Sequence, residues 1–177
     1  MPVDQRDQLW ESTYDTYYEA YFQELFADDL VTVWRNIDES TKVIVAITAT
    51  GSVVSGWALW QAKAGQIVWV IIAGFVAVVA IVHATLGVPA KLKDWGEVKH
   101  IFTALRIDLE TFRHQMLIDP EFPLDEYKHK FNEYRDRYRD GMQRIQNDIF
   151  RTLRRANNIQ SSLNERLADL IIEEQGV

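Results

Sequence analysis

The stretch IVWVIIAGFVAVVAIV, residues 67–82, decides the fold class, because it belongs to a run of 23 residues, 67–89, without Asp, Glu, Lys or Arg. A second uncharged run of 18 residues, VIVAITATGSVVSGWALW at 43–60, precedes it. A helix of roughly 20 apolar residues crosses a hydrocarbon core of about 30 Å. We therefore predict an all-α membrane protein in which a turn at 61–66 joins two transmembrane helices, 43–60 and 67–89. The alternative for the first run, which is rich in hydroxyl residues, is a buried core helix.

Basic residues predict how this hairpin is oriented. Five basic residues flank the two runs on their outer sides: Arg35, Lys42, Lys91, Lys93 and Lys99. Only Lys63 lies between the two runs. Because basic residues favour the cytoplasmic side, both termini are expected in the cytoplasm, with the hairpin in the membrane. The N-terminal sequence MPVDQRDQLW lacks the basic start and apolar core of a cleavable signal peptide.

Composition excludes several classes of function. The chain of 177 residues carries a net charge of −7, and this acidic balance disfavours a nucleic-acid binder. It has no cysteine, which rules out disulfides and thiol catalysis, and its four histidines lack the spacing of a metal-binding pair. No constellation of catalytic side chains is recognisable. We therefore expect no enzymatic activity, no metal and no cofactor.

Small residues mark candidate surfaces for helix packing in the membrane. In the second run they recur at spacings of 4, 3, 4 and 3 residues, at Ala73, Ala77, Ala80, Ala84 and Gly87. In the first run, Ser52 and Gly56 form one pair four residues apart. Small side chains let helix backbones approach closely in lipid. Two helices cannot enclose an aqueous path, so a pore would require several copies of the chain, and we expect four or more.

Polar residues within the runs suggest a second kind of site. Thr48, Ser52 and Ser55 lie along one strip of the first run, and His83 lies inside the second. An ionisable group in a span indicates a functional site, so these residues are candidates to line a pore, with His83 as a support or a proton-sensitive element. In the alternative interpretation, His83 bonds a hydroxyl of the partner helix and the hydroxyls bond their own backbone.

The segments outside the two runs are predicted to be cytoplasmic helices that form a bundle. Residues 1–42 form an amphipathic helix that continues directly into the first span. Residues 90–118 carry a heptad seam of seven apolar side chains, which we interpret as an assembly surface: Trp95, Val98, Phe102, Leu105, Leu109, Phe112 and Met116. A turn at 119–123 follows, because its two prolines interrupt helical hydrogen bonding.

The C-terminal segment 124–175 keeps a helical period and is predicted to be one long helix, with Gly141 and Asn157-Asn158 as the places where it would break. It is too long to pack only on 90–118, so its far end is expected to meet the N-terminal helix or another subunit. Its basic residues are densest at Arg151, Arg154 and Arg155. They form either a salt-bridged face that complements the acidic N-terminal helix or an anion site for a nucleotide, a phosphoinositide or a nucleic-acid signal.

The layout of the chain resembles the SLATT family of small bacterial proteins with two transmembrane helices. The similar stretches are TYYEAYFQELFADDL before the first span, and LKDWGEVKHIFTALRIDLETFRH and DEYKHKFNEYRDRYRDGMQRI after the second. The resemblance implies an oligomeric effector in bacterial anti-phage defence that permeabilises the inner membrane after a nucleotide or protein trigger. It carries over no catalytic residue. The alternative function is a membrane-anchored coiled-coil scaffold or adaptor without a pore.

Overall fold

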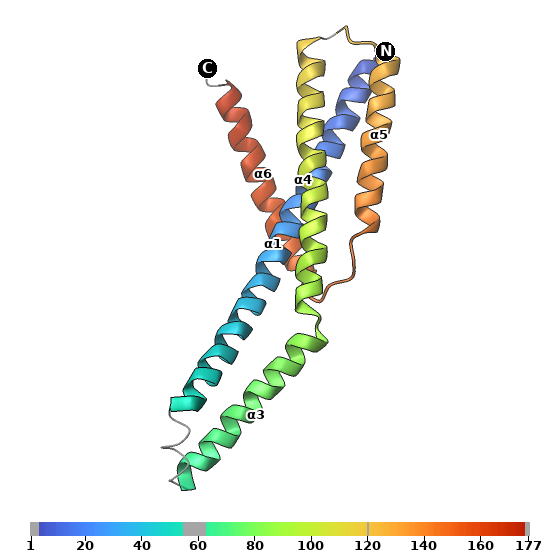
Figure 1. Ribbon diagram of the computed structural model, residues 1–177. Coiled ribbons are helices and arrows are strands. Elements are labelled where there is room, and N and C mark those ends of the chain that lie inside the picture. The colour runs from blue at the N-terminus through green and yellow to red at the C-terminus, as the bar shows by residue number, and fades with distance from the viewer. Residues whose placement is uncertain (1–3, 55–62, 120, 176–177) are drawn as a thin grey trace. The chain divides into compact units, whose positions relative to one another are not determined.

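The computed structural model describes residues 4–54, 63–119 and 121–175. Side chains are described at all of these positions except 49–54, 63–66, 69 and 170–175. Every regular element in these ranges is an α-helix, as predicted: α1 (Gln5–Val54), α3 (Lys63–Thr85), α4 (Val88–Ile118), α5 (Leu124–Gln143) and α6 (Leu153–Gln175) (Figure 1). Helix α1 runs without interruption from the acidic N-terminal segment into the first uncharged run.

The chain divides into two compact units, and α1 and α4 each contribute to both. The first unit, here called the aromatic unit, consists of Met1–Leu30 and Trp95–Val177. The second, here called the apolar unit, consists of Val31–Asp94.

The seven heptad side chains of α4 form the core of the aromatic unit. All of them are at most 3% exposed. The ring of Phe112 stacks on Tyr127 of α5 with ring centroids 5.0 Å apart, and Leu9 of α1 joins Met116 in the same apolar cluster. The expectation that this heptad seam joins separate subunits is wrong, because α1 and α5 of the same chain cover it.

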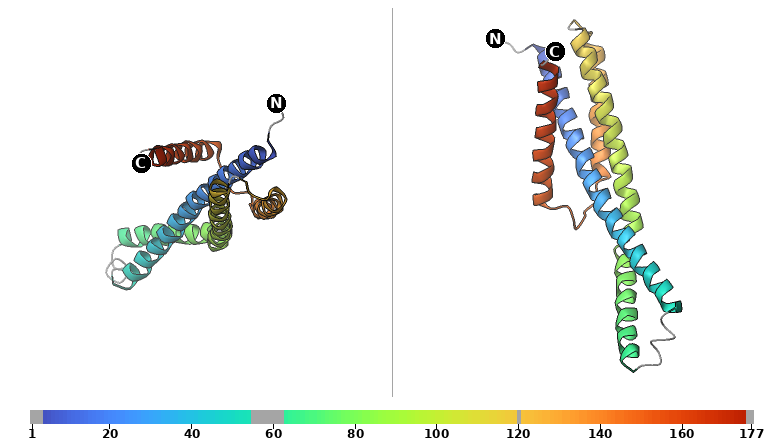
Figure 2. Two further views of the ribbon diagram at one scale, coloured as in Figure 1. Left: turned by 90° about the horizontal axis from the view of Figure 1, so that it is seen from above. Right: turned by 90° about the vertical axis from the view of Figure 1, so that its left-hand side faces the viewer.

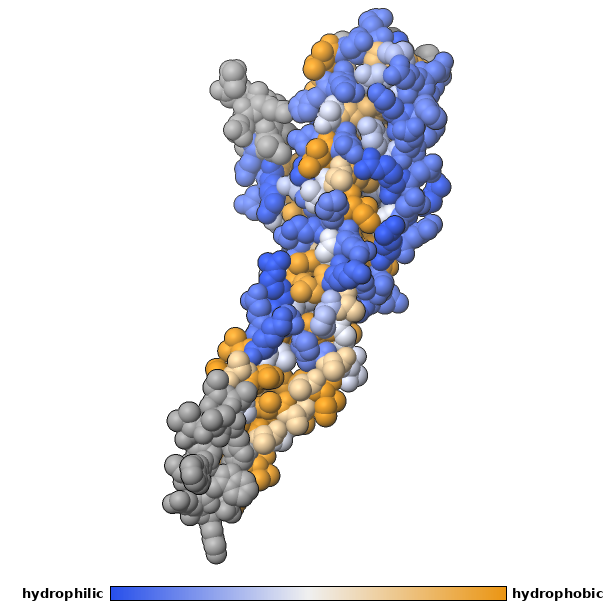
Figure 3. Space-filling view, in the orientation of Figure 1, coloured by the Kyte–Doolittle hydropathy of each residue, from blue (hydrophilic) through white to orange (hydrophobic). Residues whose placement is uncertain are grey.

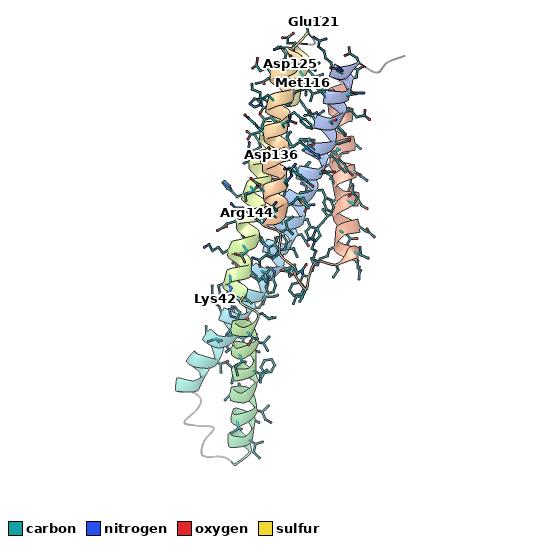
Figure 4. All side chains as sticks on the ribbon, turned by 90° about the vertical axis from the view of Figure 1, so that its right-hand side faces the viewer. Lys42, Met116, Glu121, Asp125, Asp136 and Arg144 are labelled. Atoms are coloured by element: carbon teal, nitrogen blue, oxygen red, sulfur yellow. The ribbon has the colours of Figure 1, made fainter. Side chains whose placement is uncertain are left out.

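Helices α4 and α5 run antiparallel, joined by the turn that contains Glu121 (Figures 1 and 4). They approach closely at Gly141, which is buried. A Cβ atom at this position would lie 2.9 Å from Cζ of Phe102. Next to it, Tyr138 meets Phe102 edge to face at 5.8 Å, and burial together with the nearby charge of Glu19 raises the pKa of Tyr138 to about 12.

The prediction of one helix over 124–175 is wrong, because residues 144–152 separate α5 from α6. The side chain of Asp148 explains the break. Its Oδ1 accepts the backbone N–H of Phe150 at 2.9 Å, and its Oδ2 accepts the indole N–H of Trp95 at 2.8 Å. An Asp that bonds nearby backbone in this way competes with helical hydrogen bonds. The predicted breaking point Asn157-Asn158 lies inside α6.

Helix α6 packs on α1 through its first half and diverges from it towards the C-terminus (Figures 1 and 2). The hydroxyl of Tyr18 donates a hydrogen bond to Oδ1 of Asn164 at 2.6 Å, and Arg155 pairs with Asp29 at 2.6 Å. Ile159 and Leu163 supply the buried apolar contacts of α6. The C-terminal segment therefore meets the N-terminal helix of its own chain, one of the two outcomes expected from its length.

In the apolar unit, the boundaries of the second uncharged helix differ from the predicted ones. Helix α3 begins at Lys63, so 63–66, predicted as part of the turn 61–66, is helical, whereas 61–62 lies outside the described residues. The helix ends at Thr85 and not at 89. Gly87 adopts a positive φ of 61°, which glycine tolerates at a helix end, and α4 begins at the next residue.

The surface of α3 is strongly apolar and exposed. Ile71 is 66% exposed and Ile81 64% exposed. Within the described residues, one helical stretch, which begins at Val70, is long and apolar enough to cross a membrane, and its most apolar part is not buried by the chain. Hydrophobic residues gather over α3 in Figure 3, whereas the surface over α4 and α5 is mainly hydrophilic.

Candidate functional site

A carboxylate lies on the buried face of α1 in the apolar unit. Asp38 is 7% exposed, and it follows the buried Trp34 by one helical turn. Ile37 and Thr41, its neighbours on the same face, are half-buried. Because removing a carboxylate from water is costly without partners, Asp38 requires hydrogen bonds or opposite charges at this place.

Each oxygen of Asp38 has one partner. Lys42, labelled on α1 in Figure 4, approaches Oδ2 through Nζ at 2.6 Å. His83 of α3 lies with Nε2 3.1 Å from Oδ1. The side chains of Asp38 and His83 are 10% and 19% exposed, whereas that of Lys42 is 71% exposed. The contact between Asp38 and His83, here called the Asp38–His83 bridge, thus joins α1 to α3 through a largely enclosed polar pair.

The bridge has the chemistry of a proton-sensitive contact. The hydrogen bond from Lys42, with a further one from His83, lowers the pKa of Asp38 against the opposing effect of its burial. Asp38 is therefore an anion at neutral pH.

We expect the contact between α1 and α3 to weaken in acid. Folding lowers the pKa of Asp38, so this carboxyl binds fewer protons in the folded state than in the unfolded state. Its contribution to the stability of the contact is therefore fully present above the ordinary pKa of about 3.9, and it is lost as the pH falls through the lowered pKa. The measurement is the distance between spin labels on α1 and α3 in detergent from pH 7 to 2. The wild-type distance should increase below about pH 4.

The matched variants for this prediction are Asp38→Asn and Glu39→Gln. Asn cannot gain the proton, so Asp38→Asn should abolish this pH transition. Glu39 is an exposed neighbour on α1, and its variant should keep the wild-type transition. Identical pH curves for Asp38→Asn and the wild type would show that the bridge does not control the contact.

Of the predicted pore-lining residues on α1, only Thr48 has a described side chain. Thr48 is half-exposed, and its hydroxyl donates to the carbonyl oxygen of Ile44 at 2.7 Å, so it bonds its own helix. The side chain of Ser52 and the whole of Ser55 lie outside the described residues. The interpretation that His83 bonds a hydroxyl of the partner helix is wrong, because its partner is the carboxylate of Asp38.

The predicted small-residue stripe of α3 does not face α1 of the same chain. Its four alanines, Ala73, Ala77, Ala80 and Ala84, are exposed. The half-buried side chains of α3 are instead Val76, Val79 and His83 on another face of the helix. Gly87, the fifth member, forms the turn before α4, and Gly56 lies outside the described residues.

The three clustered arginines have different surroundings. Arg155 pairs with Asp29, which fits the salt-bridged interpretation. Arg151 lies over the ring of Phe26 with its guanidinium carbon 5.7 Å from the centroid. Arg154 is exposed and makes no ion pair within the part of the chain that the structure describes. The salt-bridged interpretation therefore holds for Arg155, and the anion-site interpretation stays a prediction.

Asp38 is the functional candidate that sequence reasoning missed. The signal was present: an acid one turn after Trp34 and one turn before the first uncharged run occupies the apolar face of the helix. Its pairing with His83 required the structure. Among the described residues, no group of three His, Asp or Glu side chains could hold a metal ion.

Comparisons of the chain with known protein families, with curated proteins and with solved structures find no match.

Proposed function

We propose that this protein is an oligomeric membrane protein in which the two predicted spans, 43–60 and 67–89, form a hairpin with both chain termini in the cytoplasm. The observation that carries the proposal is the exposure of the apolar side chains of α3, such as Ile71 and Ile81. An apolar surface of this extent is unfavourable in water, whereas lipid chains accommodate it and a helix satisfies its own backbone there.

In this proposal four or more copies surround a pore. The alanines of α3 support this arrangement, because they face away from their own chain and are accessible to a neighbouring copy. The strip of Thr48, Ser52 and Ser55 on α1 would line the conduit. The Asp38–His83 bridge would hold the two spans together on their cytoplasmic side, and its opening would gate the pore.

The test of the pore is single-channel recording in planar bilayers, together with an oligomer count by native mass spectrometry in nanodiscs. We expect discrete unitary currents from an assembly of at least four chains. Silent bilayers with a ring-shaped oligomer present, over a range of voltages, would rule out the pore. A monomer would rule out the assembly.

We expect the alanine stripe to control assembly. Ala77→Leu combined with Ala80→Leu adds bulk where helix backbones would approach, and overpacking of a contact costs about 1–3 kcal/mol. Association measured by energy transfer between labelled copies should weaken roughly tenfold or more. The control is Val78→Leu, on a neighbouring face that is 58% exposed. Equal losses in both variants would show that bulk anywhere on α3 disturbs the protein, and that the stripe is not the contact.

For the biological role we propose an effector of bacterial anti-phage defence that permeabilises the inner membrane after a nucleotide or protein trigger. The support is the resemblance to the SLATT family in layout. The test is inducible expression in a bacterium with a dye that reports membrane potential. Depolarisation on induction is expected, and a stable potential at full expression during phage infection would contradict the role.

The second candidate function is a membrane anchor that presents the aromatic unit to partner proteins. The burial of the heptad seam within one chain favours it, because the seam no longer serves assembly. The double variant Thr48→Leu and Ser52→Leu separates the two functions. A scaffold should keep its activity in cells, whereas a pore lined by these residues should lose conductance.

A further inference from the structure

The contact between α1 and α6 in the aromatic unit contains two adjacent cavities. Both open to the surface, because Thr152, Leu153 and Arg154 in their lining are exposed. The first cavity, of about 410 Å³, is lined by Asp29, Thr152, Arg154, Arg155, Asn158 and Ile159. The second has about 400 Å³, and Phe22, Phe26, Arg151 and Leu153 are among its lining residues. Thr152 borders both, so the two cavities lie next to each other.

The first cavity suits a phosphate group. Arg154 is exposed without an ion pair among the described residues, and Arg155 has Asp29 as its carboxylate partner. Thr152 and Asn158 add a hydroxyl and an amide, both of which donate hydrogen bonds. Guanidinium groups bind phosphate oxygens in bidentate fashion, more strongly than neutral donors do.

The second cavity suits a flat apolar group. The rings of Phe22 and Phe26 stack with centroids 6.0 Å apart and planes 28° apart. The guanidinium of Arg151 covers Phe26 from above. Phe26 is 3% exposed, because its ring already contacts Phe22 and Arg151, so a flat ligand group would meet the more exposed ring of Phe22. A volume of about 400 Å³ lies within the usual range of small-molecule sites.

We propose that the two cavities form one site for an organic phosphate with a flat apolar body. The phosphate lies between Arg154 and Arg155, and the ring lies against Phe22. Three arginines border the site against one carboxylate, which leaves two positive charges for a phosphate monoester of about −1.5 to −2. On binding, the phosphate replaces Asp29 as the partner of Arg155. The ligand therefore competes with the ion pair between α6 and α1. The proposal stands apart from pore formation, because it concerns binding alone.

The test is calorimetric titration of the full chain in detergent, with empty micelles as the blank. Phenyl phosphate is the probe for the whole site, and inorganic phosphate and phenol probe its two halves. We expect phenyl phosphate to bind at least tenfold more tightly than either half. Arg154→Ala should weaken its binding about tenfold or more, since hydrogen bonds to charged groups have effects of this size. The matched control is Arg139→Ala on α5, where the side chain is 70% exposed.

Asp29→Asn separates a ligand site from a structural role of the ion pair. If Asp29 competes with the ligand for Arg155, the variant should bind phenyl phosphate several-fold more tightly than the wild type. Weaker binding in this variant, or equal affinities in Arg154→Ala and Arg139→Ala, would overturn the site. Equally tight binding of benzoate would overturn the assignment to phosphate.

Discussion

Replacing Val78 with arginine is expected to reduce membrane insertion of the chain by about 100-fold, because arginine near the centre of a span costs about 2.5–3.5 kcal/mol. Val78 lies near the middle of the predicted span 67–89 and is 58% exposed in α3. Its side chain therefore faces away from the rest of the described chain, and in the proposed arrangement the new charge would meet lipid. The measurement is the fraction of protein that stays in bacterial membranes after alkaline extraction, compared with the wild type.

The control is Ile107→Arg. Ile107 is also an exposed aliphatic residue, at 48%, but it lies on α4 in the aromatic unit, outside both predicted spans. If exposure to lipid distinguishes α3, this variant should remain in the membrane as the wild type does. Retention of Val78→Arg at the wild-type level would mean that α3 does not lie in the hydrocarbon core.

Replacing Phe102 with alanine is expected to lower the free energy of unfolding of the aromatic unit by about 3–5 kcal/mol. Phe102 is fully buried and meets Tyr138 edge to face. Removing the ring loses its burial and leaves a cavity between α4 and α5 that neighbouring helices fill only in part. Chemical denaturation of the full chain in detergent, followed by tryptophan fluorescence, measures the change.

A second α4 variant, Leu117→Ala, controls for side-chain truncation as such. Leu117 is 59% exposed, so its loss should change stability by less than about 0.5 kcal/mol. A decrease of similar size in both variants would show that the heptad face does not stabilise the unit.

Sequence periodicity predicted much of the fold because each helix follows a local rule. The uncharged run around Phe75 predicted α3, and the alternating spacing of three and four residues predicted the buried face of α4. The break between α5 and α6 was not predictable in this way. Ile145, Ile149 and Leu153 keep the helical spacing across it, and Asp148 meets Trp95, its partner, only in the folded chain.

The candidate site was harder to predict than the fold. His83 was identified because a histidine is conspicuous among aliphatic residues, but its partner depends on the register of two helices whose paired residues are 45 positions apart. The same applies to the arginines near α6. Their cluster is evident in the sequence, whereas the difference between Arg155 and Arg154 depends on where α6 meets Asp29.

The close approach of α5 to α4 restricts how this protein can change over evolution. A methyl group at position 141 would lie 2.9 Å from Phe102 and 3.2 Å from Ile101, so alanine there requires the neighbouring side chains to give way. A smaller residue at 102 would provide the space, which makes the two positions interdependent. Natural variants and selected libraries should therefore acquire a larger residue at 141 mainly after, or together with, a reduction at 102, and the order of such substitutions should be predictable.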